Sequence, residues 1–358
     1  MRFNHKKPLM ALVMLIAALA LAVGISACGG GSSSSSSEST EAESAPAEET
    51  ETGEETSEEE PAEEGEEPEL VKGEAITKNP ENAKVSLTIG SKNFPEQEIL
   101  GEIYAQALAA AGYKAKSDLS LGSETVALKT LKSGQISGYP EYASTALTSF
   151  FGLEPEEVPS DATEAWEKAN AEFEKEGLEA FEPTPFASAN AVGLLKSTAE
   201  KYDLKTVSDL EGVSEKLSLY GSPECRQRID CLAGLEKLYG LKFKEFKPVD
   251  ISLRYTVLEK GQADLSILFT TDPQLAAEKE KFVILEDDKH VFPAGNIIFV
   301  TQKKVAEEAG PDYEKTILNV QKGLTLPVMQ ELDARVELEK ETPKAAAAAY
   351  LEAAGYVE

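Results

Sequence analysis

Three segments of the sequence place charged, hydroxyl or aromatic side chains where a strand would end or a helix would begin. In the first, residues 90–96, Lys92 precedes a helix that Pro95 would start. The unpaired N–H groups of a helix N-terminus, together with a nearby cation, favour the binding of an anion. A lysine in a loop is more often simply solvated, so this segment alone indicates an anion site only weakly.

The second segment, residues 139–145, groups two tyrosines and two hydroxyl side chains at another predicted helix start. Tyr142 is either a half-buried core aromatic or a residue of a site, because its ring is apolar and its hydroxyl is polar. Thr145 is either a helix cap or a hydrogen-bonding residue of the same site. Alone, this segment does not distinguish a structural role from a ligand site, and it must be considered together with the other two segments.

The third segment, residues 221–231, holds Cys225, Arg228 and Cys231. In an exported protein the two cysteines are expected to form a disulfide. Their loop is short, so the bond would contribute about 2 kcal/mol of stability and would stiffen the segment that holds Arg228. Arg228 is either an anion-binding residue or a surface arginine paired with an acid.

The composition excludes several functional classes. Among 358 residues there are 64 acidic and 35 basic side chains, a net charge of −29. Nucleic-acid binding needs a basic face, and docking on an anionic lipid surface is disfavoured for the same reason. With two histidines and three cysteines, a multi-histidine metal centre and a four-cysteine zinc site are excluded. We therefore predict no metal, no cofactor and no nucleic-acid partner.

Only one histidine, His290, is a candidate for catalysis. The other, His5, lies in residues 1–28, which we interpret below as a signal peptide. His290 could form an acid–base pair with Asp287 or Asp288, although this acidic stretch is more typical of a solvated turn. No nucleophile elbow, P-loop or metal-spacing motif supports an enzyme. We therefore predict that the protein is not an enzyme and assign no catalytic residue.

Residues 1–28 have the pattern of a secretory signal peptide: a basic start, an apolar run and small residues before Cys28. The last four residues resemble a bacterial lipobox, in which the cysteine is lipidated. The alternative is a retained membrane-anchor helix, because about 20 apolar residues can span a bilayer. Residues 29–80 follow as a Gly/Ser- and Glu-rich tether, whose composition predicts disorder.

Residues 81–358 alternate short apolar runs with amphipathic helices, which predicts an α/β fold. Strands are predicted at 85–89, 115–121, 136–139, 191–195, 217–220, 264–269, 282–285 and 297–300. Helices are predicted at 95–111, 123–132, 142–151, 162–175, 305–309, 313–323, 327–332 and 343–354.

Taken together, the motifs are similar to those of the osmoprotectant-binding proteins of ABC importers, the glycine betaine, carnitine and choline type. The resemblance rests on residues 90–97, 131–136, 139–142, 221–235, 253–255, 271–272 and 285–290, and it covers about 270 residues. It implies a two-lobed, type II periplasmic-binding-protein fold with the ligand cleft between the lobes. Lobe 1 would comprise 81–188 and 291–358, and lobe 2 would comprise 189–290.

The resemblance also implies how a ligand would be held. Lys92, Thr145 and Arg228 match the positions at which family members bind the carboxylate of a betaine. These residue types suit one anion, because arginine can bind a carboxylate bidentately. Lys92 and Thr145 would come from one lobe and Arg228 from the other, so the ligand would favour closure.

At the cationic end the sequence departs from the family pattern. Tyr142 matches one tyrosine of the aromatic cage, which binds a quaternary ammonium by cation–π attraction, and Phe269 offers another ring. Asn190 stands where the family has a further tyrosine. Residues 292–295 also lack a tyrosine that the family has in the corresponding stretch. Asn190 would therefore suit an amine with N–H groups better than a trimethylammonium.

The predicted function is an extracytoplasmic receptor that captures a small zwitterionic osmolyte and delivers it to an ABC permease and its ATPase. We expect a monomer held on the outer side of the cytoplasmic membrane by a lipid anchor. Two alternatives stay open at this point. One is a receptor for an amino acid or another carboxylated amine, and the other is a sensory or surface lipoprotein without a transport role.

Overall fold

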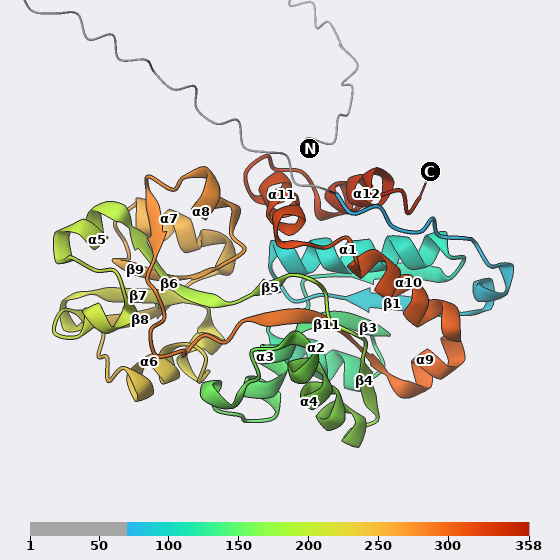
Figure 1. Ribbon diagram of the computed structural model, residues 1–358, viewed down its shortest axis with the longest axis horizontal. Coiled ribbons are helices and arrows are strands. Elements are labelled where there is room, and N and C mark those ends of the chain that lie inside the picture. Colours follow the sequence, from blue (N-terminus) through green and yellow to red (C-terminus); the bar gives the residue numbers. More distant parts are fainter. Residues whose placement is uncertain (1–69, 358) are drawn as a thin grey trace, which may run out of the picture. The chain divides into compact units, whose positions relative to one another are not determined.

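The computed structural model describes residues 70–357. The predicted signal peptide, Cys28 and most of the predicted tether therefore lie outside the described residues. Residues 70–357 contain two separate β-sheets, each flanked by helices (Figure 1). In this part of the chain no helix is long and apolar enough to cross a membrane.

The first sheet has six strands in the order β2, β1, β3, β11 and β4, with β5 paired to β11. Their bounds are β1 Ser86–Gly90, β2 Lys114–Asp118, β3 Gly138–Tyr142, β4 Leu178–Ala180, β5 Ala187–Ser188 and β11 Gly295–Gln302. β1 runs parallel to β2 and β3, whereas β11 runs antiparallel to β3 and β4. A strand from the C-terminal part of the chain thus completes a sheet that the N-terminal strands begin.

The second sheet has five strands in the order β10, β6, β9, β7 and β8. Their bounds are β6 Asn190–Leu195, β7 Ser218–Gly221, β8 Glu245–Pro248, β9 Leu265–Phe269 and β10 Phe282–Ile284. The chain enters this sheet between β5 and β6 and leaves it between β10 and β11. The predicted lobe boundaries at 188–189 and 290–291 fall in these two crossings.

Helices follow most strands, as the alternating pattern predicts. They are α1 Pro95–Ala110, α2 Glu124–Lys132, α3 Ala143–Thr145, α4 Ala162–Lys175, α5 Lys196–Tyr202, α6 Leu232–Leu238, α7 Arg254–Glu259, α8 Pro273–Ala277, α9 Lys303–Ala309, α10 Pro311–Gln321, α11 Leu326–Glu337 and α12 Pro343–Ala353. A π-helical turn, Ala146–Phe150, continues α3. Short 3-10 turns lie at Pro80–Lys84, Pro155–Glu157, Val207–Leu210, Ser214–Lys216, Pro223–Arg226 and Ile251–Leu253.

The centre of the first sheet is buried on both faces, as β11 shows. Ile297 and Phe299 belong to the apolar cluster that includes side chains of α1, α10, α11 and α12. Ile298 and Val300 belong to the cluster with side chains of α2 and α4. Neighbouring residues of a strand point to opposite faces, so an apolar run without alternation is what this central position requires.

Residues 71–79, which we expected to belong to the tether, are bound to the C-terminal helices. The Gly73 N–H donates to the carbonyl of Ala354 at 3.0 Å, and the Ile76 N–H donates to Tyr356 at 2.8 Å. The Asn319 side chain also donates to the Glu74 carbonyl at 2.7 Å. The ordered part therefore begins before residue 81, because these backbone groups have partners that composition alone cannot reveal.

The packing of β3 against β11 gives a first test. A Cβ added at Gly138 would lie 2.4 Å from two ring carbons of Phe299 and 3.0 Å from the Tyr313 hydroxyl. Phe299 is completely buried, so the ring has little room to move. We expect Gly138→Ala to lower the free energy of unfolding by about 1–3 kcal/mol, as measured by urea denaturation.

The double variant Gly138→Ala/Phe299→Leu is the matched control. A smaller side chain at 299 leaves room for the new methyl group, so its loss of stability should be less than the sum of the two single losses. Additive losses would contradict the proposed contact.

Candidate ligand-binding site

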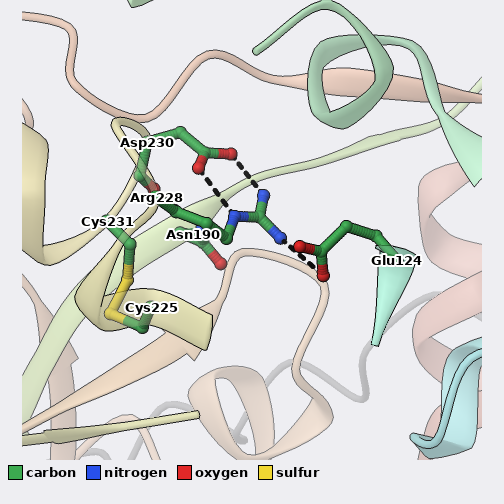
Figure 2. The surroundings of a disulfide bond; sticks show 6 residues. All are labelled: Glu124, Asn190, Cys225, Arg228, Asp230 and Cys231. Carbon is green, nitrogen blue, oxygen red and sulfur yellow. Dashed lines mark hydrogen bonds and ion pairs between the residues drawn. A yellow bond between two sulfur atoms is a disulfide. The ribbon is translucent and has the colours of Figure 1, made fainter. Parts of the chain in front are cut away.

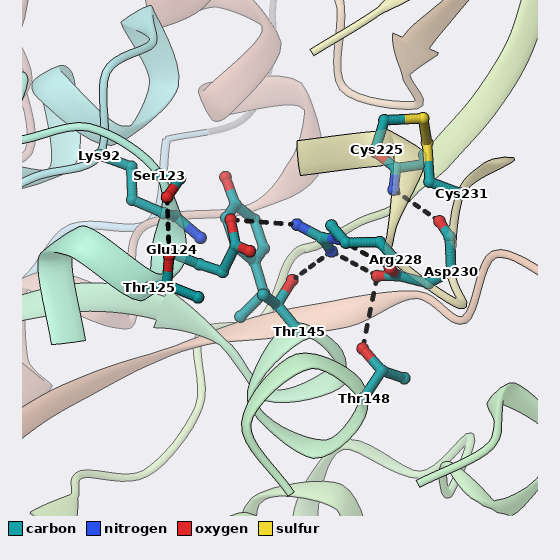
Figure 3. Close-up of polar contacts among 12 residues, drawn as sticks. Lys92, Ser123, Glu124, Thr125, Thr145, Thr148, Cys225, Arg228, Asp230 and Cys231 are labelled. Carbon is teal, nitrogen blue, oxygen red and sulfur yellow. Dashed lines mark hydrogen bonds and ion pairs between the residues drawn. A yellow bond between two sulfur atoms is a disulfide. The ribbon is translucent and has the colours of Figure 1, made fainter. Parts of the chain in front are cut away.

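One cavity brings together every residue that the sequence predicted for a ligand. It has a volume of about 80 Å³, and its walls come from segments that adjoin both sheets. The predicted residues that line it are Lys92, Tyr142, Thr145, Asn190, Arg228 and Phe269. Figure 3 shows Lys92, Thr145 and Arg228 converging from three different segments of the chain.

Lys92 lies in the turn after β1 and is 4% exposed, so it is not the solvated loop lysine that we considered. Its ammonium forms an ion pair with Glu141 and lies 4.4 Å from the centre of the Tyr142 ring. Glu141 is fully buried and also accepts a hydrogen bond from the Tyr142 N–H at 2.8 Å. A buried cation needs such a partner, because leaving water is costly for an unpaired charge.

Arg228 lies after Cys225 in the loop that follows β7. Its Nε donates to Asp230 Oδ1 at 2.7 Å, and its Nη2 contacts the other carboxylate oxygen of Asp230 (Figure 2). The same Nη2 lies 3.4 Å from Thr145 Oγ1. The arginine is thus paired with an acid, as one alternative held, yet it lies in the cavity rather than on the surface.

A disulfide and an amide hold the loop that carries Arg228. Cys225 and Cys231 are bonded, with their Cα atoms 5.2 Å apart (Figure 2). The Asn190 side chain donates to the carbonyl of Asp230 at 2.9 Å. One N–H group of Asn190 is therefore already bonded to the protein, which leaves less of the hydrogen-bonding capacity of Asn190 for a ligand.

Phe94 and Phe292 also line the cavity, and the sequence analysis assigned them no role. The Phe94 ring lies 6.4 Å from that of Tyr142 and 5.3 Å from that of Phe269, measured between ring centres. Phe94 lies within residues 90–97, which carried the resemblance, whereas Phe292 lies in residues 292–295, where the sequence departs from the family pattern. The position of each ring in these two stretches was the available signal.

Gly295 ends the stretch 292–295, in which the family pattern has a tyrosine. The surroundings of Gly295 leave no room for a side chain. A Cβ at this position would be 2.2 Å from Ser144 Oγ. The start of β11 therefore passes directly against α3. Aromatic groups for the cavity must come from elsewhere, which fits the presence of Phe94 and Phe292.

Behind Tyr142 lies a pair of buried acids. The Tyr142 hydroxyl donates to Glu96, and Asp333 of α11 is buried close to Glu96. Within residues 70–357, one carboxyl oxygen of each acid has no hydrogen-bond partner. Burial raises the pKa of Glu96, and the hydrogen bond from Tyr142 opposes this rise. Burial raises the pKa of Asp333 well above its ordinary value, and the charge of Glu96 adds to this rise.

A second group of charges connects α11 to helices beside the second sheet. Arg254 of α7 is 3% exposed and donates to Asp272 at 3.0 and 2.5 Å. It also donates to Glu337 of α11 at 3.0 Å. Its guanidinium lies 5.0 Å from the centre of the Phe269 ring, so this group borders the cavity.

The histidine considered for catalysis lies elsewhere. His290 is exposed, at a turn with φ of 58°, and it does not line the cavity. Asp287 accepts from the Tyr239 hydroxyl at 2.7 Å, and Asp288 accepts from Ser208. Within residues 70–357, no side-chain hydrogen bond or ion pair joins His290 to either acid. In the same part of the chain, no group of three or more His, Cys, Asp and Glu residues is placed to hold a metal.

Comparison with known proteins gives consistent matches. A family model described as the substrate-binding domain of ABC-type glycine betaine transport systems matches residues 85–353. A glycine-betaine-binding protein from Pseudomonas aeruginosa is 32% identical over 277 residues, 74% of this chain and 87% of the relative. An ergothioneine transport permease/ergothioneine binding protein from Helicobacter pylori is 28% identical over 80% of this chain, and the match spans 51% of that relative. A crystal structure described as a glycine betaine/carnitine/choline ABC transporter has a TM-score of 0.59 and 26% identity, and it covers 76% of this chain and 100% of the other.

The buried acid pair gives a prediction about pH. Asp333 keeps its proton in the folded chain at pH values where the unfolded chain has lost it, because its folded pKa is raised. The stability that the protonated Asp333 gives the fold is thus fully present below about pH 4. It is lost as the pH rises through the folded pKa of Asp333. Asp333→Asn removes this dependence. We therefore expect the free energy of unfolding of Asp333→Asn, relative to that of the natural chain, to rise with pH. The rise should be about 1.4 kcal/mol per pH unit from about pH 4 up to the folded pKa of Asp333.

Urea denaturation from about pH 4 to pH 8 measures this difference. Asp118→Asn is the control, since Asp118 is exposed at the end of β2, and its difference from the natural chain should stay flat. A flat difference for Asp333→Asn would show that folding does not raise the pKa of Asp333.

Proposed function

Because the chain belongs to the family of substrate-binding domains of ABC-type glycine betaine transport systems, we propose that it is an extracytoplasmic receptor for a small zwitterion such as glycine betaine. The family and the two-lobed α/β fold are those predicted from the motifs. The observation that carries the proposal is one cavity lined by Lys92, Arg228 and Arg254 together with hydroxyl groups and several aromatic rings.

The size of the cavity favours a small ligand. At roughly 10–15 Å³ for one water, a cavity of about 80 Å³ has space for roughly five to eight water-sized groups. This is suitable for a molecule of fewer than about ten heavy atoms, which is the size of glycine betaine.

We propose that Lys92, Thr145 and Arg228 bind the carboxylate of the ligand. Arg228 keeps some bonding capacity, because its Nη1 makes no hydrogen bond within residues 70–357 and lies 3.6 Å from Glu124. Lys92 and Thr145 adjoin the first sheet, whereas Arg228 follows a strand of the second. A carboxylate between them would bridge the lobes and favour the closed state.

The cationic end of the ligand would lie against aromatic rings. Tyr142 and Phe269 were predicted for this role, and Phe94 lies between them. Cation–π attraction would hold a quaternary ammonium there. The ring faces already have protein cations nearby, Lys92 over Tyr142 and Arg254 over Phe269, which supports a weaker preference for full methylation than a complete cage would give.

Membership of the family supports delivery of the ligand to a permease, and we propose that the ATPase of an ABC importer works with that permease. We propose that the receptor acts as a monomer that is held at the outer face of the cytoplasmic membrane by lipid on Cys28. An amino acid or another carboxylated amine is the second candidate ligand, favoured by the cations that already face the rings. A titration panel of glycine betaine, carnitine, choline and free amino acids separates these ligands, and binding of none of them would overturn the proposal.

Substitution of Arg228 tests the carboxylate contact. A charge-assisted hydrogen bond contributes roughly 1.5–3 kcal/mol, so Arg228→Ala should weaken glycine betaine binding by about ten- to a hundredfold. Arg228→Lys should recover only part of the affinity, because the planar fork is lost. Isothermal titration calorimetry gives both values.

Arg226→Ala is the matched control for this pair. Arg226 ends the 3-10 turn two residues before Arg228, but it is exposed and donates to the Phe246 carbonyl. Its removal should leave the affinity unchanged. Equal affinities for Arg228→Ala and the natural chain would show that the carboxylate is not held as proposed.

The lipid anchor has a separate test. If Cys28 is lipidated after cleavage, Cys28→Ala should release the protein from membranes into the soluble fraction. Membrane fractionation after an alkaline wash, with immunoblotting, measures this. A Cys28→Ala protein that stays in the membrane pellet would instead support the retained anchor helix, and Cys225→Ala serves as the control for loss of a cysteine elsewhere.

A further inference from the structure

Glu124 lies in the proposed ligand cavity but was not among the residues that the sequence predicted. It is the first residue of α2, its side chain is 5% exposed, and it lines the cavity. Its Oε2 lies 3.6 Å from Arg228 Nη1. Figure 3 shows it between Lys92 and Arg228, which is where the carboxylate of a ligand would bind.

Glu124 is the least satisfied of the acids around these two cations. A separation of 3.6 Å is an ion pair but is too long for a hydrogen bond. Within residues 70–357, no side chain donates a hydrogen bond to Glu124, whereas Asp230 and Glu141 receive donors from Arg228 and Lys92. The Glu124 carboxylate can therefore move or change its charge without breaking a hydrogen bond to another side chain.

The charges around the cavity explain why this matters. Lys92 and Arg228 supply two positive charges, and Glu124, Glu141 and Asp230 beside them supply three negative ones. Arg254 and Glu224, which also line the cavity, add one charge of each sign. A ligand carboxylate next to Lys92 and Arg228 would therefore be a fourth anion beside these two cations, in a space of low dielectric constant where like charges repel strongly.

We propose that Glu124 is a specificity-determining residue of this site. Its ionised carboxylate competes with the carboxylate of the ligand for Lys92 and Arg228, and it lets the site accept cationic ligands that have no carboxylate. This inference rests on the proposed function, because it assumes that Lys92 and Arg228 face the ligand. The sequence motifs gave no sign of this role, because Glu124 and Arg228 are 104 positions apart in the chain.

The titration of Glu124 gives the proposal a second readout. Burial raises its pKa, while the charges of Arg228 and Lys92 act in the opposite direction and Glu141 raises it slightly. As the pH falls through this raised pKa, Glu124 takes up a proton and the competition ends. Affinity for a carboxylated ligand should therefore increase on acidification, whereas affinity for choline should fall.

Titration calorimetry of the full chain with glycine betaine and with choline tests this. In Glu124→Gln we expect the ratio of the two affinities, glycine betaine over choline, to rise by about tenfold or more, which corresponds to about 1.4 kcal/mol. The ratio should also rise in the natural chain, but not in the variant, as the pH is lowered from neutral through the raised pKa of Glu124. Glu124→Ser, which keeps a residue that suits a helix start, should raise the ratio in the same way.

Glu164→Gln is the control for charge, because Glu164 is an exposed acid in the first turn of α4, and its ratio should equal that of the natural chain. An unchanged ratio in both Glu124 variants, or weaker binding of glycine betaine, would overturn the role of Glu124 while leaving the receptor function intact. If neither ligand binds to the natural chain or to any variant, the proposed function fails and this inference fails with it.

Discussion

The cations of the cavity are buried, and the cost of burying charge determines how the surrounding structure is built. Lys92 and Arg254 are less than 5% exposed, and Arg228 is largely covered. Each has a carboxylate partner close by: Glu141 for Lys92, Asp230 for Arg228 and Asp272 for Arg254. Removing one partner would leave an unpaired buried charge, which is far more costly than loss of a surface ion pair. The walls of the cavity are therefore fixed by pairs rather than by single residues.

The sequence predicted the fold well where local pattern decides it. The apolar stripe of 95–111 and the glycine after it predicted α1, which ends where Gly112 adopts a φ of 103°. The prediction was less accurate for β3, which we placed at 136–139 and which lies at Gly138–Tyr142. Tyr142 thus ends a strand instead of starting a helix. The short elements β4, β8 and α5–α8 were missed, because segments of three to seven residues carry too little periodicity to be recognised.

For the site, residue types were predictable but their partners were not. All six predicted ligand residues line one cavity, because the motifs mark the ends of strands that meet at the same place. The acids that pair with them were not foreseen. Lys92 and Glu141 are 49 positions apart, and Glu124 had no predicted role. Such pairings follow from the packing of two sheets, and a single sequence without that packing offers no signal for them.

Asp230 has two opposing effects on Arg228, and both bear on how tightly a ligand can bind. It orders a long side chain before binding, which saves part of the roughly 2 kcal/mol of rotamer entropy that ordering an arginine costs. The disulfide and Asn190 extend this order to the whole loop. The same carboxylate also neutralises the charge that a ligand would meet, so attraction from a distance is reduced. Selectivity in this arrangement then depends on the carboxylate of Glu124, which receives no side-chain hydrogen bond within residues 70–357, rather than on the number of cations in the cavity.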